Sequence, residues 1–159
     1  MTTSRTPTSS DAAHSGLVYR CVPTTSDDLA VLARMLGGLG AARDVRCVTL
    51  PGPPRPKERP RFNRATGNAY VSREARQAAA HTRGLLVESG VRCDTGPLAV
   101  ALLFARTDRR RVDLDNFVKE CLDCANGVVW GDDSQVMALA ARMIVDPRLP
   151  RTVLAVASL

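Results

Sequence analysis

The sequence predicts a small α/β domain of the α+β type, in which helices pack against a mixed β-sheet. Residues 98–104 are almost wholly apolar, which is typical of a strand covered on both faces at the centre of a sheet. Residues 72–90 and 116–126 place apolar side chains at helical spacing. Strand patterns at 135–145 and 152–157 close the chain. At 159 residues the chain is long enough for one domain with a substantial core.

The first 44 residues are expected to add two segments to this domain. Residues 1–15 are rich in Ser and Thr and lack apolar periodicity, so they are predicted to be a disordered tail. Residues 16–44 are predicted to be a helical extension, in which Leu17–Tyr19 is a strand or a staple and a helix runs from Ser26 to Gly37. This helix carries no polar cluster, so packing or a dimer contact is favoured over chemistry.

Residues 45–159 are the predicted main domain. It begins with a strand at 45–50 and continues into a segment at 51–62 that is rich in proline and in positive charge. Proline at this density excludes a helix or a central strand, so the segment is expected to be extended and exposed. Alternate side chains of an extended chain point the same way, so its cations can follow a phosphate backbone from one side. Taken alone, the segment fits a solvated, proline-stiffened loop equally well. The cations are Arg55, Lys57, Arg59 and Arg61.

Turn and cap signals order the rest of the chain. A turn at 64–68 leads into a short strand at 69–71. Ser72 is a good N-cap for the helix that ends near Gly90. The last two strands are separated only by a turn at 146–150, so they are expected to pair as a hairpin.

The composition of the chain indicates which class of partner the protein binds and in which compartment it works. The net charge is +6 and the estimated pI is 9.5, which suits an anionic partner such as nucleic acid without requiring one. Five scattered cysteines and the absence of a signal-like apolar run favour a reducing cytoplasm over a disulfide framework. No apolar stretch is long enough to span a bilayer. Cys121 and Cys124 fall inside a predicted helix without a second pair, so half-buried helix residues are expected there rather than a metal or redox site.

Carboxylates and cations are concentrated near the middle of the main domain. Carboxylates that are brought together repel one another, so some protonate or a cation sits between them. Oxygen ligands select Mg²⁺ or Mn²⁺ over zinc, and such an ion polarises a phosphodiester and helps to ionise the attacking water. The three arginines at 109–111 are expected to attract the phosphate chain. The lysine at 119 is expected to stabilise the charge that develops on the phosphate or to hold a carboxylate in place. The residues are Arg109, Arg110, Arg111, Asp113, Asp115, Lys119, Asp132 and Asp133.

A structural role explains part of the same pattern. Asp115 is well placed to cap the helix that follows, and Asp115 with Lys119 is an ordinary i,i+4 ion pair. Asp132 and Asp133 fit a simple turn. A helix N-terminus also favours a phosphate over a cation. The proximity of the two Asp pairs to each other and to the basic segment shifts the interpretation toward a metal site, provided that the pairs converge.

The same stretch carries a longer signature. The run Arg111-Val112-Asp113-Leu114-Asp115-Asn116, followed by Lys119, Asp123, Asn126-Gly127, Trp130, Asp132-Asp133 and Gln135, resembles the signature of the RusA family of Holliday junction resolvases. The upstream Pro54-Arg55-Pro56-Lys57 and Arg59-Pro60-Arg61 resemble the basic N-terminal loop of many members. The resemblance spans about 45–157.

The resemblance implies a mixed α/β homodimer that binds four-way DNA junctions in recombination and repair and cuts them with Mg²⁺. By position, Asp113, Asp115 and Asp133 correspond to the metal-binding catalytic carboxylates and Lys119 to the essential lysine, with Asp132 supporting or sharing the site. Other branched DNA is an expected substrate as well. The alternative is a non-catalytic branched-DNA-binding module that uses the same basic surface.

Overall fold

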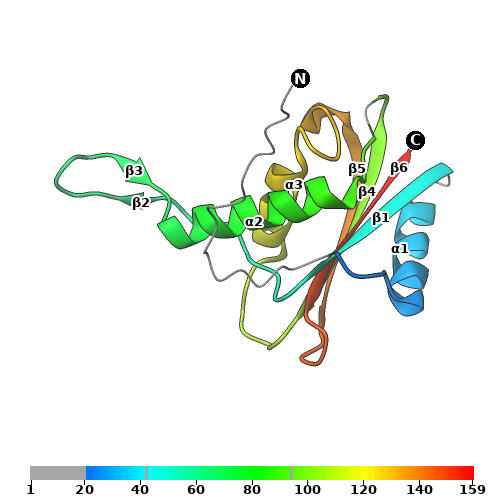
Figure 1. The fold of residues 1–159 in the computed structure, drawn as a ribbon, viewed down its shortest axis with the longest axis horizontal. Coiled ribbons are helices and arrows are strands. Elements are labelled where there is room, and N and C mark those ends of the chain that lie inside the picture. Colours follow the sequence, from blue (N-terminus) through cyan, green and yellow to red (C-terminus); the bar gives the residue numbers. More distant parts are fainter. Residues whose placement is uncertain (1–20, 42, 94) are drawn as a thin grey trace, which may run out of the picture.

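A computed structural model describes residues 21–41, 43–93 and 95–159 of the chain. Its elements surround one four-stranded sheet, with α2 and α3 on one face and α1 on the other (Figure 1). The predicted tail at 1–15 and the segment Leu17–Tyr19 lie outside the described residues. The elements are α1 (Ser26–Gly38), β1 (Arg43–Pro51), β2 (Arg61–Phe62), β3 (Ala69–Tyr70), α2 (Arg73–Ser89), β4 (Leu98–Arg106), α3 (Leu114–Ala125), a 3₁₀ turn at Asp133–Gln135, β5 (Val136–Val145) and β6 (Arg151–Ser158).

The order of strands in the sheet is β1-β6-β4-β5, so the predicted mixed sheet is confirmed. β4 pairs antiparallel with β6 and parallel with β5. The predicted hairpin of the last two strands is therefore wrong, because β4 lies between them. Strand β4 is apolar and is buried along eight of its nine residues. A strand of this kind is stabilised by a neighbouring strand on each side, and this burial outweighs the closeness in sequence that favours a hairpin of β5 and β6.

Each face of the sheet buries its own cluster. On one face Val100, Leu102 and Phe104 of β4 pack with residues of α2, α3 and β6, and the Phe104 and Phe117 rings are 5.4 Å apart. On the other face Leu32 and Leu36 of α1 pack against the small side chains of β4 and β6. The predicted helix in the N-terminal extension thus covers a face of the sheet that otherwise lies open. Its small-residue floor consists of Ala99, Ala101, Ala155 and Ala157.

A buried ion pair fastens α1 to the sheet. Arg151 at the start of β6 donates from Nε and Nη2 to both carboxylate oxygens of Asp28, each at 2.7 Å. It also donates from Nη1 to Asp146 at 2.7 Å. Asp28 is 2% exposed and Arg151 6% exposed, so the two-pronged contact replaces water for both groups. No sequence pattern pointed to Asp28, because its partner is 123 residues away.

The helix ends explain where the segments turn. Ser72 caps α2 by accepting from the Ala75 backbone N–H at 3.1 Å, and Gly90 ends the helix in the left-handed conformation, as predicted. None of the helices formed by the described residues is long and apolar enough to cross a membrane.

Replacing Asp28 by Asn should lower the free energy of unfolding by about 3 kcal/mol, because the buried guanidinium loses an ionic partner. The hydrogen bonds from Arg151 hold the pKa of the Asp28 carboxyl below its usual value. The pair therefore contributes fully above pH about 4, near the unfolded pKa, and its contribution is lost as the pH falls through the folded-state pKa.

Urea unfolding of both proteins at neutral and acidic pH measures these effects. Asp27→Asn is the matched control, since this neighbour in α1 is exposed and should change the free energy by no more than about 0.5 kcal/mol. Equal stability of the two variants at neutral pH would contradict the role of the ion pair.

Candidate active site

The first acidic pair lies at the N-terminus of α3. The helix begins at Leu114, and Asp113, in extended conformation, is its N-cap, although its side chain makes no capping hydrogen bond. The expectation that Asp115 caps the helix is therefore wrong, because the helix starts earlier and Asp115 lies in its first turn. The Asp113 carboxylate is exposed and is not used for capping.

Asp115 contacts the cation predicted for it. Its carboxylate lies 3.5 Å from Lys119 Nζ, and the two side chains are 63% and 64% exposed. An exposed i,i+4 pair of this kind stabilises a helix by only about 0.3–0.5 kcal/mol. Folding therefore leaves both groups available for a ligand.

The turn before α3 is held by a small network. Arg106 at the end of β4 donates to the Asp108 carboxylate at 3.1 Å and to the Arg110 carbonyl at 2.7 Å. Its guanidinium also lies 5.6 Å from the centre of the Phe117 ring. The network fixes the path of the chain from the sheet to Asp113. The basic triplet of Arg109, Arg110 and Arg111 is exposed on this path, directly ahead of the first acidic pair.

The second acidic pair belongs to the 3₁₀ turn ahead of β5. Asp132 caps that turn by accepting from the Ser134 backbone N–H at 2.8 Å. Hydrogen bonding from the side chain of Ser134, together with this backbone bond, lowers the pKa of the Asp132 carboxyl. Asp133 accepts from Trp130 Nε1 at 2.8 Å. Gln135 completes the turn by accepting from the backbone of Gly131 and Asp132. The turn interpretation of this pair is thus confirmed, and both carboxylates remain at the surface.

The first acidic pair lies at the start of α3, and the second lies in the 3₁₀ turn that follows the opposite end of this helix. Figure 1 shows α3 running between the end of β4 and the start of β5. The helix has 12 residues and is therefore about 18 Å long. Trp130 forms a bridge with Asn126 at the far end of the helix, and Asp133 is attached to the Trp130 ring. In the described part of the chain no three His, Cys, Asp or Glu side chains form a group that can hold a metal ion. The expected convergence does not occur within one chain, because the parallel pairing of β4 and β5 requires α3 to run back along the sheet between the two pairs.

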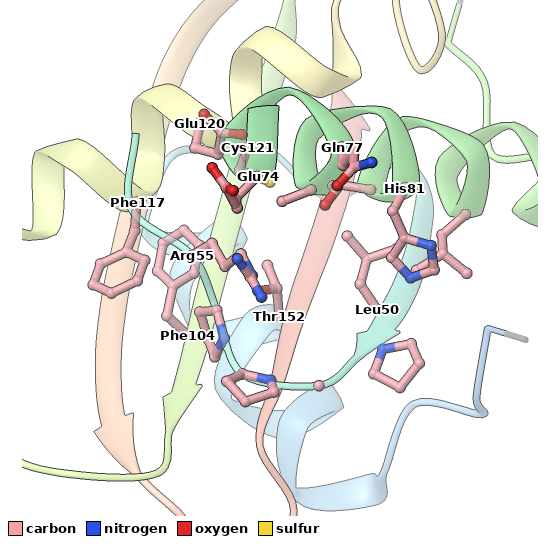
Figure 2. A pocket seen from close by; sticks show the side chains of 17 residues that line it. Leu50, Arg55, Glu74, Gln77, His81, Phe104, Phe117, Glu120, Cys121 and Thr152 are labelled. Carbon is pink, nitrogen blue, oxygen red and sulfur yellow. The ribbon is translucent and has the colours of Figure 1, made fainter. Parts of the chain in front are cut away.

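The cations of the extended segment do not all face one side. Lys57 pairs with Asp123 of α3, and its backbone N–H donates to the Asn116 carbonyl at 2.9 Å. Arg55 lines a cavity instead and points into it (Figure 2). The segment is thus attached along α3, beside the first acidic pair. Only the fold brings Lys57 to its two contacts on α3, so sequence spacing gave no sign of them.

The cavity beside Arg55 has a volume of about 480 Å³ and lies between the extended segment, α2 and α3. Figure 2 shows Glu74, His81, Phe104 and Glu120 around it. None of the four aspartates of the acidic pairs lines this cavity. The carboxylates of the acidic pairs therefore lie at the open surface, where a long polymer has access, and not in an enclosed pocket.

Cys121 and Cys124 are buried on the inner side of α3, which confirms the helix interpretation of this Cys-x-x-Cys. Burial raises the pKa of the Cys121 thiol to about 12 and that of Cys124 to about 11. Thiols with such pKa values stay protonated at neutral pH and are poor nucleophiles and metal ligands.

Comparison with known families decides the relationship of the chain. The family model described as endodeoxyribonuclease RusA matches residues 51–157, which is more than half of the chain. The chain belongs to the RusA endodeoxyribonuclease family. RusA enzymes are hydrolases that cut phosphodiester bonds of DNA at crossover junctions. The match includes the basic segment, both acidic pairs and Lys119, and it leaves α1 outside. No curated protein matches the chain.

Proposed function

We propose that the chain is a Mg²⁺-dependent endodeoxyribonuclease, with Mn²⁺ as a possible substitute, that resolves Holliday junctions or related branched DNA in the cytoplasm during recombination and repair. The observation that supports it most directly is the set of carboxylates that folding leaves free. Asp113 is not used as a side-chain cap, and Asp115 and Lys119 are joined only by a weak exposed pair. Exposed carboxylates beside an arginine triplet fit a site that receives a phosphate chain.

The donor set fits a hard divalent ion, because all of its ligands are carboxylate oxygens. When bound, such an ion polarises the phosphodiester and lowers the pKa of a water molecule. Asp113, Asp115 and Asp133 are the proposed ligands, with Asp132 sharing or supporting the site. Lys119 is proposed to balance charge on the phosphate. Arg109, Arg110 and Arg111, with Arg55, Lys57, Arg59 and Arg61, are proposed to bind the DNA backbone.

A homodimer completes this site in a way that one chain does not. The outer edge of β5 has no strand partner in the described part of the chain, and Met137 and Leu139 on it are 70% and 40% exposed. If two copies pair antiparallel along this edge, the start of one β5 lies beside the end of the other. Asp133 opens the 3₁₀ turn that leads directly into β5, and the end of β5 lies next to Arg106, which leads to Asp113. Two-fold pairing therefore brings Asp132 and Asp133 of one copy toward Asp113 and Asp115 of the other, twice per dimer.

This arrangement also matches the symmetry of the substrate. A four-way junction has approximate two-fold symmetry and requires two matched cuts, which two identical sites can supply. Leu139 lies in register with Val100, on the face of the sheet that carries α3. A second α3 on that face would cover the exposed leucine. The dimer thus accounts for an apolar edge as well as for an incomplete site.

Asp113→Asn should reduce Mg²⁺-dependent cutting of a four-way junction by at least about 100-fold, because a metal ligand is lost. Binding of the junction should persist or tighten, since repulsion between carboxylate and phosphate decreases. A panel of labelled junctions, flaps and duplexes with Mg²⁺ measures cutting, and gel shifts measure binding. Asp27→Asn on the opposite face of the sheet is the control. A protein that only binds DNA would give salt-dependent binding without products, and full activity of Asp113→Asn would refute the site.

Mixing two inactive variants tests whether the site is shared between subunits. In a mixed dimer of Asp113→Asn with Asp133→Asn, a shared arrangement leaves one of the two sites entirely unaltered. Equal amounts of the two proteins, denatured together and refolded, should therefore regain nicking of one strand of the junction, while each variant alone stays inactive. If each chain builds its own site, every site in the mixture carries a substitution and no activity returns.

Leu139→Asp should weaken the dimer, because it places two like charges near the two-fold axis of the proposed strand pairing. Analytical ultracentrifugation should show a shift from dimer to monomer, accompanied by loss of cutting. Val87→Asp is the matched control, since Val87 on α2 is also apolar and is 62% exposed. An unchanged dimer in Leu139→Asp would place the interface elsewhere.

A further inference from the structure

A small hairpin projects from the body at the start of α2 (Figure 1). Its strands β2 and β3 pair antiparallel with Arg61 opposite Tyr70 and Phe62 opposite Ala69. They form a sheet separate from the four-stranded one, and every residue from 59 to 71 is exposed. A hairpin of two-residue strands gains little stability from its own hydrogen bonds, and its exposed side chains add no buried core.

The hairpin exposes aromatic rings that the rest of the fold buries. Phe62 is 73% exposed and Tyr70 is 49% exposed, whereas Phe104, Phe117 and Trp130 are each at most 3% exposed. Burial of a phenylalanine contributes strongly to folding, so an exposed ring on a projecting element marks a contact surface. Because Phe62 lies opposite Ala69 and Tyr70 opposite Arg61, each side of the hairpin presents one ring.

Positive charge surrounds these rings. Between residues 59 and 76 there are five arginines and one acidic residue, Glu74. Arginines beside open aromatic rings match the two parts of a nucleotide, since the guanidinium contacts phosphate and the ring stacks on a base. An apolar protein surface would not require this charge, and a phosphate backbone alone would not require the rings. The arginines are Arg59, Arg61, Arg64, Arg73 and Arg76.

The base of the hairpin is fixed to the body. The Glu58 carboxylate accepts from the Ser72 hydroxyl and pairs with Arg61 at 2.8 Å. Ser72 is also the N-cap of α2. These contacts tie both ends of the hairpin to the start of the helix, so the rings are presented on a positioned support rather than on a free loop.

The hairpin and the first acidic pair can reach the same DNA molecule. Lys57, attached to the Asn116 carbonyl of α3, is five residues before Phe62. Five extended residues span at most about 17 Å, which is less than the width of a DNA duplex. A DNA arm whose phosphates lie at Asp113 therefore passes within reach of the hairpin.

We infer that the hairpin reads the branch point of the DNA, with Phe62 stacking on a base that is left unstacked where the arms diverge. This inference rests on the proposed function and extends it to the choice of substrate. An intact duplex offers phosphates to the arginines but no free base face to the ring. Stacking at a branch point therefore adds affinity for junctions and little for duplexes.

Binding in EDTA tests the hairpin without any cutting step. Phe62→Ala should weaken binding to a four-way junction about ten-fold while duplex binding changes less than about two-fold. Phe62→Trp should retain the junction preference. Arg64→Gln should weaken both substrates alike and reduce the salt dependence by about one charge. Val87→Ala is the control for removal of an exposed apolar side chain outside the hairpin.

A second measurement reports the stacking itself. A junction with 2-aminopurine at the branch point should lose fluorescence on binding the unaltered protein and the Trp variant, and should lose less on binding Phe62→Ala. Equal loss of junction and duplex affinity in Phe62→Ala, or an unchanged preference, would overturn the inference. So would dissociation of a dimer by Phe62→Ala, which would make the ring a contact between copies.

The two proposals fail in different ways. If the unaltered protein shows no preference for the junction over the duplex, the proposed function fails and the role of the hairpin fails with it. If the unaltered protein prefers and cuts junctions while Phe62→Ala keeps that preference, only the role of the hairpin is overturned.

Discussion

Parallel pairing of β4 with β5 is the constraint on which the rest of the arrangement depends. Two parallel neighbours require the chain to return from the end of one strand to the start of the next, and α3 makes that return. The segments before and after α3 are thereby held at opposite ends of the sheet. The first acidic pair belongs to the segment before the helix and the second to the segment after it. The crossover therefore fixes the position of each pair and keeps the two pairs of one chain apart. The proposed symmetric partner would satisfy both demands at once.

The central strands impose a second requirement. β4 and β6 are apolar on both faces, so a sheet covered only by α2 and α3 would leave Leu103 and Val153 in water. Helix α1 covers that face, and its alanine floor allows a close approach. The Asp28–Arg151 pair adds direction to this contact, because two hydrogen bonds to one carboxylate fix the rotation of the helix as well as its position. The segment outside the family match is thus part of the folded body.

Local sequence patterns predicted most helices and strands of the fold. They did not predict the contacts between residues that are far apart in the chain. The central strand, the cap at Ser72 and the stop at Gly90 follow from residues that act within one turn, and all three are confirmed. The pairing of the last two strands depends on which strands pair with β4, and no short stretch of the sequence contains that information. The same limit applies to the site. Residue types identified the carboxylates and the family, whereas their separation is set by the crossover, and the attachment of Lys57 is set by packing on α3.

The charged residues between 55 and 76 differ in whether they have an acidic partner, and this difference separates their roles. Lys57 and Arg61 have acidic partners and contribute first to the shape of the segment, while Arg59 and Arg64 project into solvent from it. Attraction to phosphate acts along the whole surface and carries no information about branching. Recognition of a junction therefore needs a group that responds to interrupted base stacking. Among the described residues between 55 and 76, Phe62 and Tyr70 carry the aromatic rings that suit this proposed role. The contacts of Glu58 with Ser72 and Arg61 hold the base of their hairpin to the start of α2.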